Sequence, residues 1–149
     1  MARTRYLLDA NCWMEVARAR AHEQEVRDLL SAVPAARLFL TDFALHSVGV
    51  ALQRHKTLEF FPLFIQQSRI GTLIEIVRLP LSEMSKLVDV CKSHRLDFDD
   101  AYQYVVAELN NLALVSLDTD FDRTPRGRLT PAAALQKFKD EQSQPQQEA

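Results

Sequence analysis

The segment 96–123, LDFDDAYQYVVAELNNLALVSLDTDFDR, constrains the fold of this chain most strongly. It opens with clustered aspartates and continues with apolar residues at helical spacing as far as Leu109. An apolar run over 112–117 then predicts a short strand that ends at Asp118. Far upstream, the apolar run 6–8 predicts another strand, which also ends in an acid, Asp9. If the two strands are neighbours in a parallel sheet, both acids lie at the edge where open α/β sheets place their ligands.

Strands and helices alternate along the rest of the chain. Further strands are expected at 37–40 and 73–79. Helical spacing and capping residues predict a helix with Asn11 as its N-cap, one over 23–32, one capped by Thr41 or Asp42, one over 58–70, and others that begin near Ser82, Asp97 and Thr130. Because two helices separate successive strands, this order predicts an α/β fold, a three-layer α/β/α sandwich with a central parallel sheet.

Length and composition fit a single globular domain. The chain has 149 residues, of which 47% are hydrophobic and 26% are charged, so it can bury a sizeable core. We expect this domain to span residues 1–140. Residues 141–149 are polar, and we expect them to form a disordered tail.

Charge and cysteine content exclude several classes of protein. The net charge of −2 excludes a broadly basic nucleic-acid coat, so any contact with nucleic acid must be local or assisted by a partner. Two cysteines are too few for a disulfide framework or a thiolate zinc site, and they are typical of reduced thiols in a cytoplasmic protein. Asp9 interrupts the N-terminal apolar run, which therefore predicts neither a signal peptide nor a membrane span.

The distribution of acids predicts a metal site. Asp9, Asp100 and Asp118 would share one small volume, which like charges tolerate only with raised pKa values or with a cation between them. Mg²⁺ and Mn²⁺ prefer carboxylate oxygens and can activate water for phosphodiester hydrolysis. Two other acids have ordinary roles, because Asp97 fits a helix N-cap and Asp99 fits the favourable dipole of a first helical turn.

The residues described so far resemble a known family, the PIN-domain ribonucleases, which include the VapC-like toxins of toxin–antitoxin pairs. The resemblance runs from about residue 6 to about residue 130, and LLDANCW, LDFDDAYQYVVAELNNLALVSLD and DTDF carry it. It implies that four aspartates bind a divalent metal and perform catalysis: Asp9, Asp100, Asp118 and Asp120. It also implies that Asn11 and Ser116 orient these carboxylates through hydrogen bonds.

One segment departs from the pattern of the family. After the second strand the family has a small hydroxyl residue, which Thr41 matches as a further supporting residue, and then a helix glutamate. Ser47 stands where that glutamate is expected. Asp42 and His46 form an i, i+4 pair on the same helix and are candidates to replace it in part. The departure bears on metal binding and on activity.

These residues support one main hypothesis and two alternatives. The main hypothesis is a toxin-like endoribonuclease that uses Mg²⁺ or Mn²⁺. The first alternative, which Ser47 favours, is a PIN-fold protein with impaired catalysis that serves as a binding or regulatory module. The second is a receiver-like phospho-acceptor domain, which is disfavoured because the segment 79–81, Leu-Pro-Leu, stands where such a domain has an acid.

Two segments are candidate contacts for partners. Arg123, Arg126 and Arg128 follow the acids and are predicted to contact RNA phosphates, with a solvated loop as the alternative. The apolar residues from Phe60 to Ile65 are more than one helix face needs. They predict a surface for a homodimer or for an antitoxin-like protein, and the alternative is that this helix is wedged in a helical layer.

Overall fold

A four-stranded parallel sheet in the order β3-β2-β1-β4 forms the centre of the computed structural model, which describes residues 3–144. β1 (Tyr6–Leu8) pairs with β2 (Leu38–Thr41) on one side and with β4 (Ala113–Val115) on the other, and β3 (Glu75–Val77) lies beyond β2. The four strands run in the same direction, as the alternation of strands and helices predicted.

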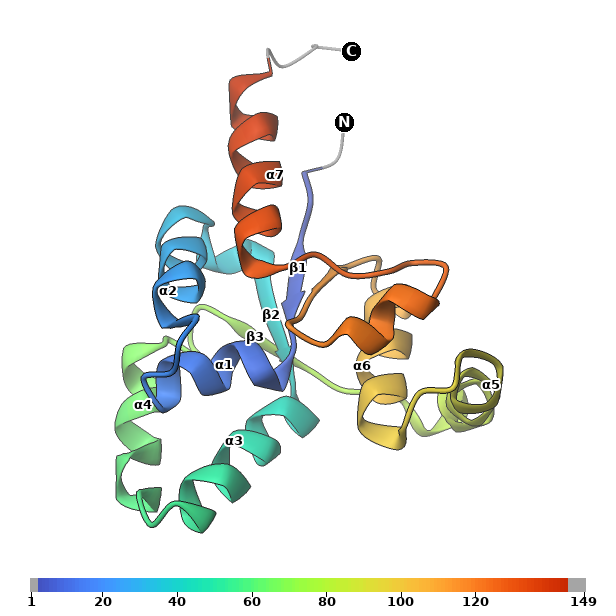
Figure 1. Ribbon diagram of the computed structural model, residues 1–149, viewed down its shortest axis with the longest axis horizontal. Helices are drawn as coiled ribbons and strands as arrows, with labels where there is room; N and C mark the ends of the chain where they lie inside the picture. Colours follow the sequence, from blue (N-terminus) through green and yellow to red (C-terminus); the bar gives the residue numbers. More distant parts are fainter. Residues whose placement is uncertain (1–2, 145–149) are drawn as a thin grey trace.

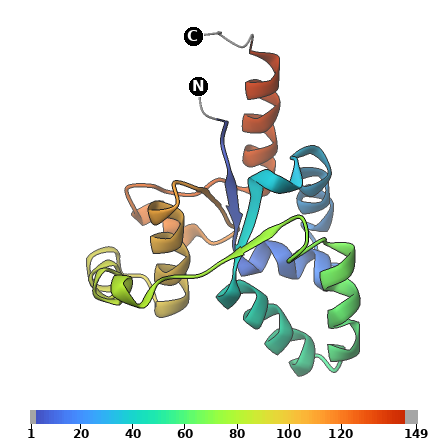
Figure 2. The same ribbon diagram turned by 180° about the vertical axis from the view of Figure 1, so that it is seen from behind.

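Helices cover both faces of this sheet (Figures 1 and 2). Tyr6 and Leu8 point into a core shared with α1 (Ala10–Ala17), α2 (Glu23–Ala32), α3 (Asp42–Arg54), α4 (Phe61–Gln67) and α7 (Pro131–Ser143). Leu7, between them, points into a second core with α5 (Met84–His94) and α6 (Phe98–Leu109). This alternation along one strand confirms the predicted three-layer sandwich.

Side chains at the helix starts explain where several elements begin. The Asp97 carboxylate accepts from the Asp100 backbone N–H at 2.9 Å and caps α6, as predicted. The Thr41 hydroxyl accepts from Ala44 N at 2.9 Å and caps α3. Short 3₁₀ turns join the other elements: η1 (Ala35–Arg37), η2 (Leu58–Phe60), η3 (Leu81–Glu83) and η4 (Thr119–Arg123).

Several expectations about element boundaries were wrong. The strand expected over 37–40 begins one residue later, at Leu38, because Arg37 ends the 3₁₀ turn η1. Asn11 lies inside α1, and Asp9 is the N-cap, since its carboxylate accepts from Ala10 N at 2.8 Å. The expected helix over 58–70 is shorter and divides into η2 and α4, because Pro62 can donate no backbone hydrogen bond and is confined to the first turn of α4. α7 continues to Ser143, past residue 140, where we expected the domain to end and the tail to follow, and residues 145–149 of that tail lie outside the described residues.

A buried arginine explains why α7 continues so far. Arg37 donates to the Thr4 carbonyl at 2.8 Å and forms an ion pair of 3.1 Å with Glu141. Glu141 also accepts from the backbone N–H and the hydroxyl of Thr4. These contacts fasten α7 to the segment just before β1 (Figure 1), whereas Asp9 follows the other end of that strand.

Apolar side chains remain exposed on one part of the surface. Phe60 is 55% exposed and Leu63 is 48% exposed, and both line a groove of about 520 Å³ with residues of α1 and α2. Among the helices of residues 3–144, none combines the length and the apolar character that crossing a membrane requires.

Candidate metal centre

The pairing of β1 with β4 brings the two halves of the acidic site together. Leu8 pairs with Val115, and the Asp9 backbone N–H donates to the Val115 carbonyl at 2.9 Å. Asp9 and Ser116 therefore follow neighbouring strands at the same edge of the sheet. These contacts bring the ends of β1 and β4 together, as expected for the carboxyl ends of neighbouring parallel strands.

Three acids from two elements form a compact cluster. Asp100 comes from the first turn of α6, Asp118 is the N-cap of η4, and Asp120 lies within η4. One carboxylate oxygen of each residue lies within 4.8 Å of those of the other two. Ligand oxygens on one Mg²⁺ ion are at most about 4.2 Å apart, so small side-chain movements would let these three bind one ion.

Asp9 lies outside this set, and hydrogen-bond donors hold both of its carboxylate oxygens. Oδ1 accepts from Ala10 N at 2.8 Å and from Gln103 Nε2 at 3.1 Å. Oδ2 accepts from Ser116 Oγ at 2.8 Å and from Asn11 Nδ2 at 3.3 Å. The Asp9 side chain thus sits buried beside the cluster in one fixed orientation.

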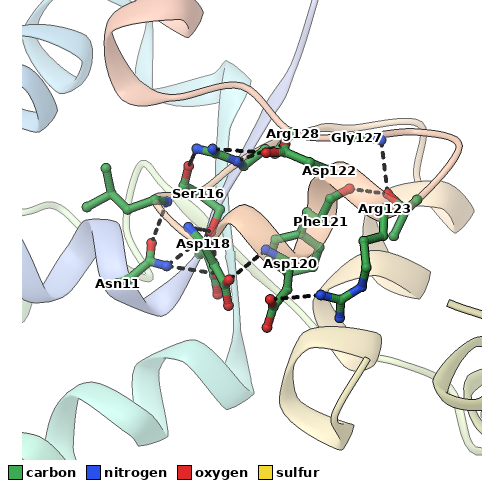
Figure 3. A network of polar contacts seen from close by, with 12 residues as sticks. Asn11, Ser116, Asp118, Asp120, Phe121, Asp122, Arg123, Gly127 and Arg128 are labelled. Atoms are coloured by element: carbon green, nitrogen blue, oxygen red, sulfur yellow. Dashed lines mark hydrogen bonds and ion pairs between the residues drawn. The ribbon is translucent and has the colours of Figure 1, made fainter. Parts of the chain in front are cut away.

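Asn11 and Ser116 link Asp9 to the loop after β4, as Figure 3 shows in part. Asn11 donates to Ser116 Oγ at 3.1 Å and accepts from Leu117 N at 3.2 Å. Ser116 Oγ also accepts from Asp118 N at 3.0 Å, and Asp118 Oδ1 accepts from Asp120 N at 2.8 Å. This chain of hydrogen bonds fixes the backbone that carries Asp118 and Asp120.

Burial and neighbouring negative charges raise the pKa of two of these carboxyl groups. Burial and the negative charges of Asp97, Asp118 and Asp9 raise the pKa of Asp100 to about 8. Burial raises the pKa of Asp9 as well, against the lowering effect of the hydrogen bonds from Ser116, Ala10 and Gln103. A cation among these acids would offset the free-energy cost of burying their negative charges and would reduce the repulsion between them. The residues therefore fit a divalent metal.

The start of α3 holds no acid at the position of the expected glutamate. The Ser47 hydroxyl donates to the Phe43 carbonyl of its own helix at 3.0 Å. Asp42 accepts from the Tyr102 hydroxyl at 2.9 Å, and His46 is exposed. The Thr41 hydroxyl is used as a helix cap. Ser47, Asp42 and Thr41 thus make hydrogen bonds within the chain, and His46 is exposed to solvent.

The three predicted RNA-binding arginines make contacts within the chain. Arg123 donates to Asp120 at 3.0 Å and to the Arg95 carbonyl at 2.6 Å. Arg128 pairs with Asp122 at 3.1 Å and donates to the Ser116 carbonyl at 3.0 Å. Arg126 donates to the Leu112 carbonyl at 3.1 Å.

Sequence reasoning missed two side chains near the site. Gln103 lies three residues after Asp100, on the same side of α6, and donates to Asp9. That spacing was the signal that could have found it. Tyr102 accepts from Leu79 N at 2.9 Å and donates to Asp42, so it connects the segment after β3 to the start of α3.

Comparisons with known proteins identify the family. A model of the PIN domain matches residues 6–127. A search of curated proteins gave no match.

Three solved structures share the fold. PAE2754 from Pyrobaculum aerophilum has a TM-score of 0.68 and 19% sequence identity, with 92% of this chain and 96% of that chain covered. A toxin–antitoxin complex from Klebsiella pneumoniae has a TM-score of 0.67 and 20% identity, with 85% and 97% covered. VapC20 from Mycobacterium tuberculosis, a toxin that cleaves the sarcin–ricin loop, has a TM-score of 0.68 and 14% identity, with 78% and 92% covered. With the family model matched over most of its length, the chain belongs to the PIN-domain family.

Proposed function

We propose that this protein is an endoribonuclease that depends on Mg²⁺ or Mn²⁺. The observation that carries the proposal is the cluster of Asp100, Asp118 and Asp120, whose oxygens lie within 4.8 Å of one another beside the buried carboxylate of Asp9. A divalent cation bound there supplies an activated water and compensates for charge on the phosphoryl oxygens.

The chain's own residues have separate roles in this proposal. Asp100, Asp118 and Asp120 hold the cation, and Asp9 is the fourth ligand, which would exchange one of its present hydrogen bonds for the cation. Asn11 and Ser116 keep the Asp9 carboxylate in place, and Thr41 fixes the start of the neighbouring helix α3. Three arginines that follow the acids bind RNA phosphates in place of their present partners within the chain. They are Arg123, Arg126 and Arg128.

The proposed setting is a toxin restrained by an antitoxin-like protein in the cytoplasm. One structural neighbour is a toxin–antitoxin complex and another is a toxin that cleaves the sarcin–ricin loop, which supports both the partner and RNA as the substrate. Both cysteines are free thiols, which fits a reducing compartment.

A homodimer is the expected assembly. Phe60 and Leu63 expose about half of their surface on neighbouring turns, and burying such a patch favours association. Sedimentation of the wild type and of Leu63→Asp at micromolar concentration tests this. A dimer that the substitution dissociates supports the proposal, and a wild-type monomer contradicts it.

A second candidate function is a PIN-fold binding module without catalysis. The observation that favours it is Ser47, whose hydroxyl bonds back to its own helix where a glutamate is expected. Such a module would retain its partner when the acids are replaced by amides.

Titration calorimetry with Mn²⁺, together with cleavage of a mixed RNA pool, separates the two candidates. The variants are Asp100→Asn, which removes a proposed ligand, and Asp99→Asn, a matched control that removes an exposed acid from the same helix turn. The nuclease proposal requires binding and cleavage in the wild type and in Asp99→Asn, and loss of both in Asp100→Asn. If the folded wild type neither binds Mn²⁺ nor cleaves RNA, the binding module is the better description.

A further inference from the structure

Gln103 is a buried polar residue on a helix whose neighbouring positions are apolar or aromatic. It lies in α6 between Tyr102 and Tyr104, and its side chain is 3% exposed. Its Nε2 atom donates to Asp9 Oδ1 at 3.1 Å. Its Oε1 atom is also buried, and among residues 3–144 it has no hydrogen-bond partner.

An acceptor left without a donor makes Gln103 a poor choice for packing alone. A buried amide that leaves one hydrogen bond unmade costs more free energy than an apolar side chain of similar size at the same position. Buried polar atoms in folded proteins nearly always have a partner, and bound water or an ion is one explanation for an atom that has none within the protein. A water molecule or an ion in the adjacent acidic site is therefore the best explanation for a glutamine at this position.

The position of Gln103 connects it to the proposed metal ligands. It follows Asp100 by three residues on α6, so both side chains lie on the same side of this helix. Its amide contacts Asp9, the acid at the end of β1. Gln103 thus joins the ligand-bearing face of α6 to the buried carboxylate beside the acidic cluster.

We propose that Gln103 is a positioning residue of the metal centre. Its Nε2 holds Asp9 Oδ1 toward the cation, and its Oε1 accepts a hydrogen bond from a water molecule held in the acidic site. This inference rests on the proposed function, because it assigns a role toward the divalent cation. Groups that orient metal ligands through hydrogen bonds typically change metal affinity by about 10–100-fold when they are removed.

The test measures Mn²⁺ affinity by calorimetry and thermal stability without metal. Gln103→Leu removes both the donor and the acceptor but keeps the bulk of the side chain. Gln103→Met is a second variant of the same length, in case the branched side chain does not pack. Val105→Ala is the matched control, because Val105 is fully buried on the opposite side of α6 and contacts the core.

We expect the loss of Mn²⁺ affinity across these variants to be unrelated to their loss of thermal stability. Gln103→Leu and Gln103→Met should raise the Kd for Mn²⁺ by about 10–100-fold. Val105→Ala should lower the melting temperature and leave the Kd within about twofold of the wild type. A purely packing role of Gln103 could not produce this difference in Mn²⁺ affinity between the Gln103 variants and Val105→Ala.

Two results would overturn the inference, and they differ from failure of the proposed function. If either folded Gln103 variant binds Mn²⁺ as tightly as the wild type, or if both variants fail to fold, Gln103 serves packing only. If the wild type itself binds no Mn²⁺, the proposed function fails and this inference fails with it.

Discussion

Arg123 Nη1 lies 3.0 Å from Asp120 Oδ1, so a residue expected to contact RNA holds a residue expected to bind metal. The same guanidinium donates to the Arg95 carbonyl at 2.6 Å, which places the positive charge between η4 and the turn before α6. In the metal-free protein Arg123 is the cation beside Asp120. We therefore expect the proposed metal ion and Arg123 to compete for this carboxylate.

Replacing Arg123 should strengthen metal binding modestly. The paired side chains are 36% and 48% exposed, and such pairs contribute only about 0.2–1 kcal/mol. Arg123→Gln should therefore lower the Kd for Mn²⁺ by up to about fivefold. Arg128→Gln is the control, because Arg128 pairs with Asp122, which is not a proposed ligand. Calorimetry in which both variants change the Kd equally would rule out the competition.

The stability of the metal-free protein should depend on pH through Asp100. Its pKa is about 8 in the folded chain against an ordinary value of 3.8, so the folded state binds this proton more tightly than the unfolded state does. The stabilisation is complete below about pH 4 and is lost as the pH rises to about 8. We expect the melting temperature of the wild type, measured in EDTA relative to that of Asp100→Asn, to fall over this range. A difference between the two proteins that does not vary with pH would contradict the raised pKa.

Restoring the expected glutamate should increase metal affinity. Ser47 is on α3, whose first turn follows β2 at the same sheet edge as the acids. Ser47→Glu adds a carboxylate there, and we expect the Kd for Mn²⁺ to fall on the order of tenfold, since affinity follows the number of charged ligands. His46→Glu adds a carboxylate at the exposed neighbouring position, and its smaller effect would measure charge alone. Equal effects would show that Ser47 does not face the site.

Removing the charge of Glu141 should destabilise the protein without changing the metal centre. Burial acts to raise the pKa of Glu141. Hydrogen bonds from Thr4 and the charge of Arg37 outweigh burial and lower this pKa. Glu141→Gln leaves the buried Arg37 without its counter-ion, and we expect a loss of about 1–3 kcal/mol in urea unfolding. Asp140→Asn, next to it on an exposed part of α7, is the control and should change stability by less than about 0.5 kcal/mol. Mn²⁺ affinity should stay the same in both variants.

Local patterns in the sequence predicted most of the fold. The N-caps Asp97 and Thr130 were identified, and the N-cap of α3 was narrowed to Thr41 or Asp42, because capping depends on residues within one helical turn. The order of strands and helices followed from the periodicity of apolar residues. α1 begins before Asn11 because Asp9 caps it, and both residue types favour a cap, so spacing alone could not choose between them.

Features that depend on distant partners could not be predicted in this way. Arg37 was assigned to a strand, yet it is a buried arginine whose partner Glu141 lies 104 positions away. The same reason explains Gln103, which looked like an ordinary polar residue on a helix until α6 was placed against Asp9. The acids themselves were found because each ends or begins a local element.

The pairing of β1 with β4 also determines when a nascent chain could complete its acidic site. Asp9 and Ser116 are 107 positions apart, and β1 can pair with β2 long before β4 has been synthesised. A chain still on the ribosome would therefore have a partial sheet with Asp9 at its end but without Asp118 and Asp120. The nuclease proposed above would therefore lack part of its metal site until its last strand enters the sheet.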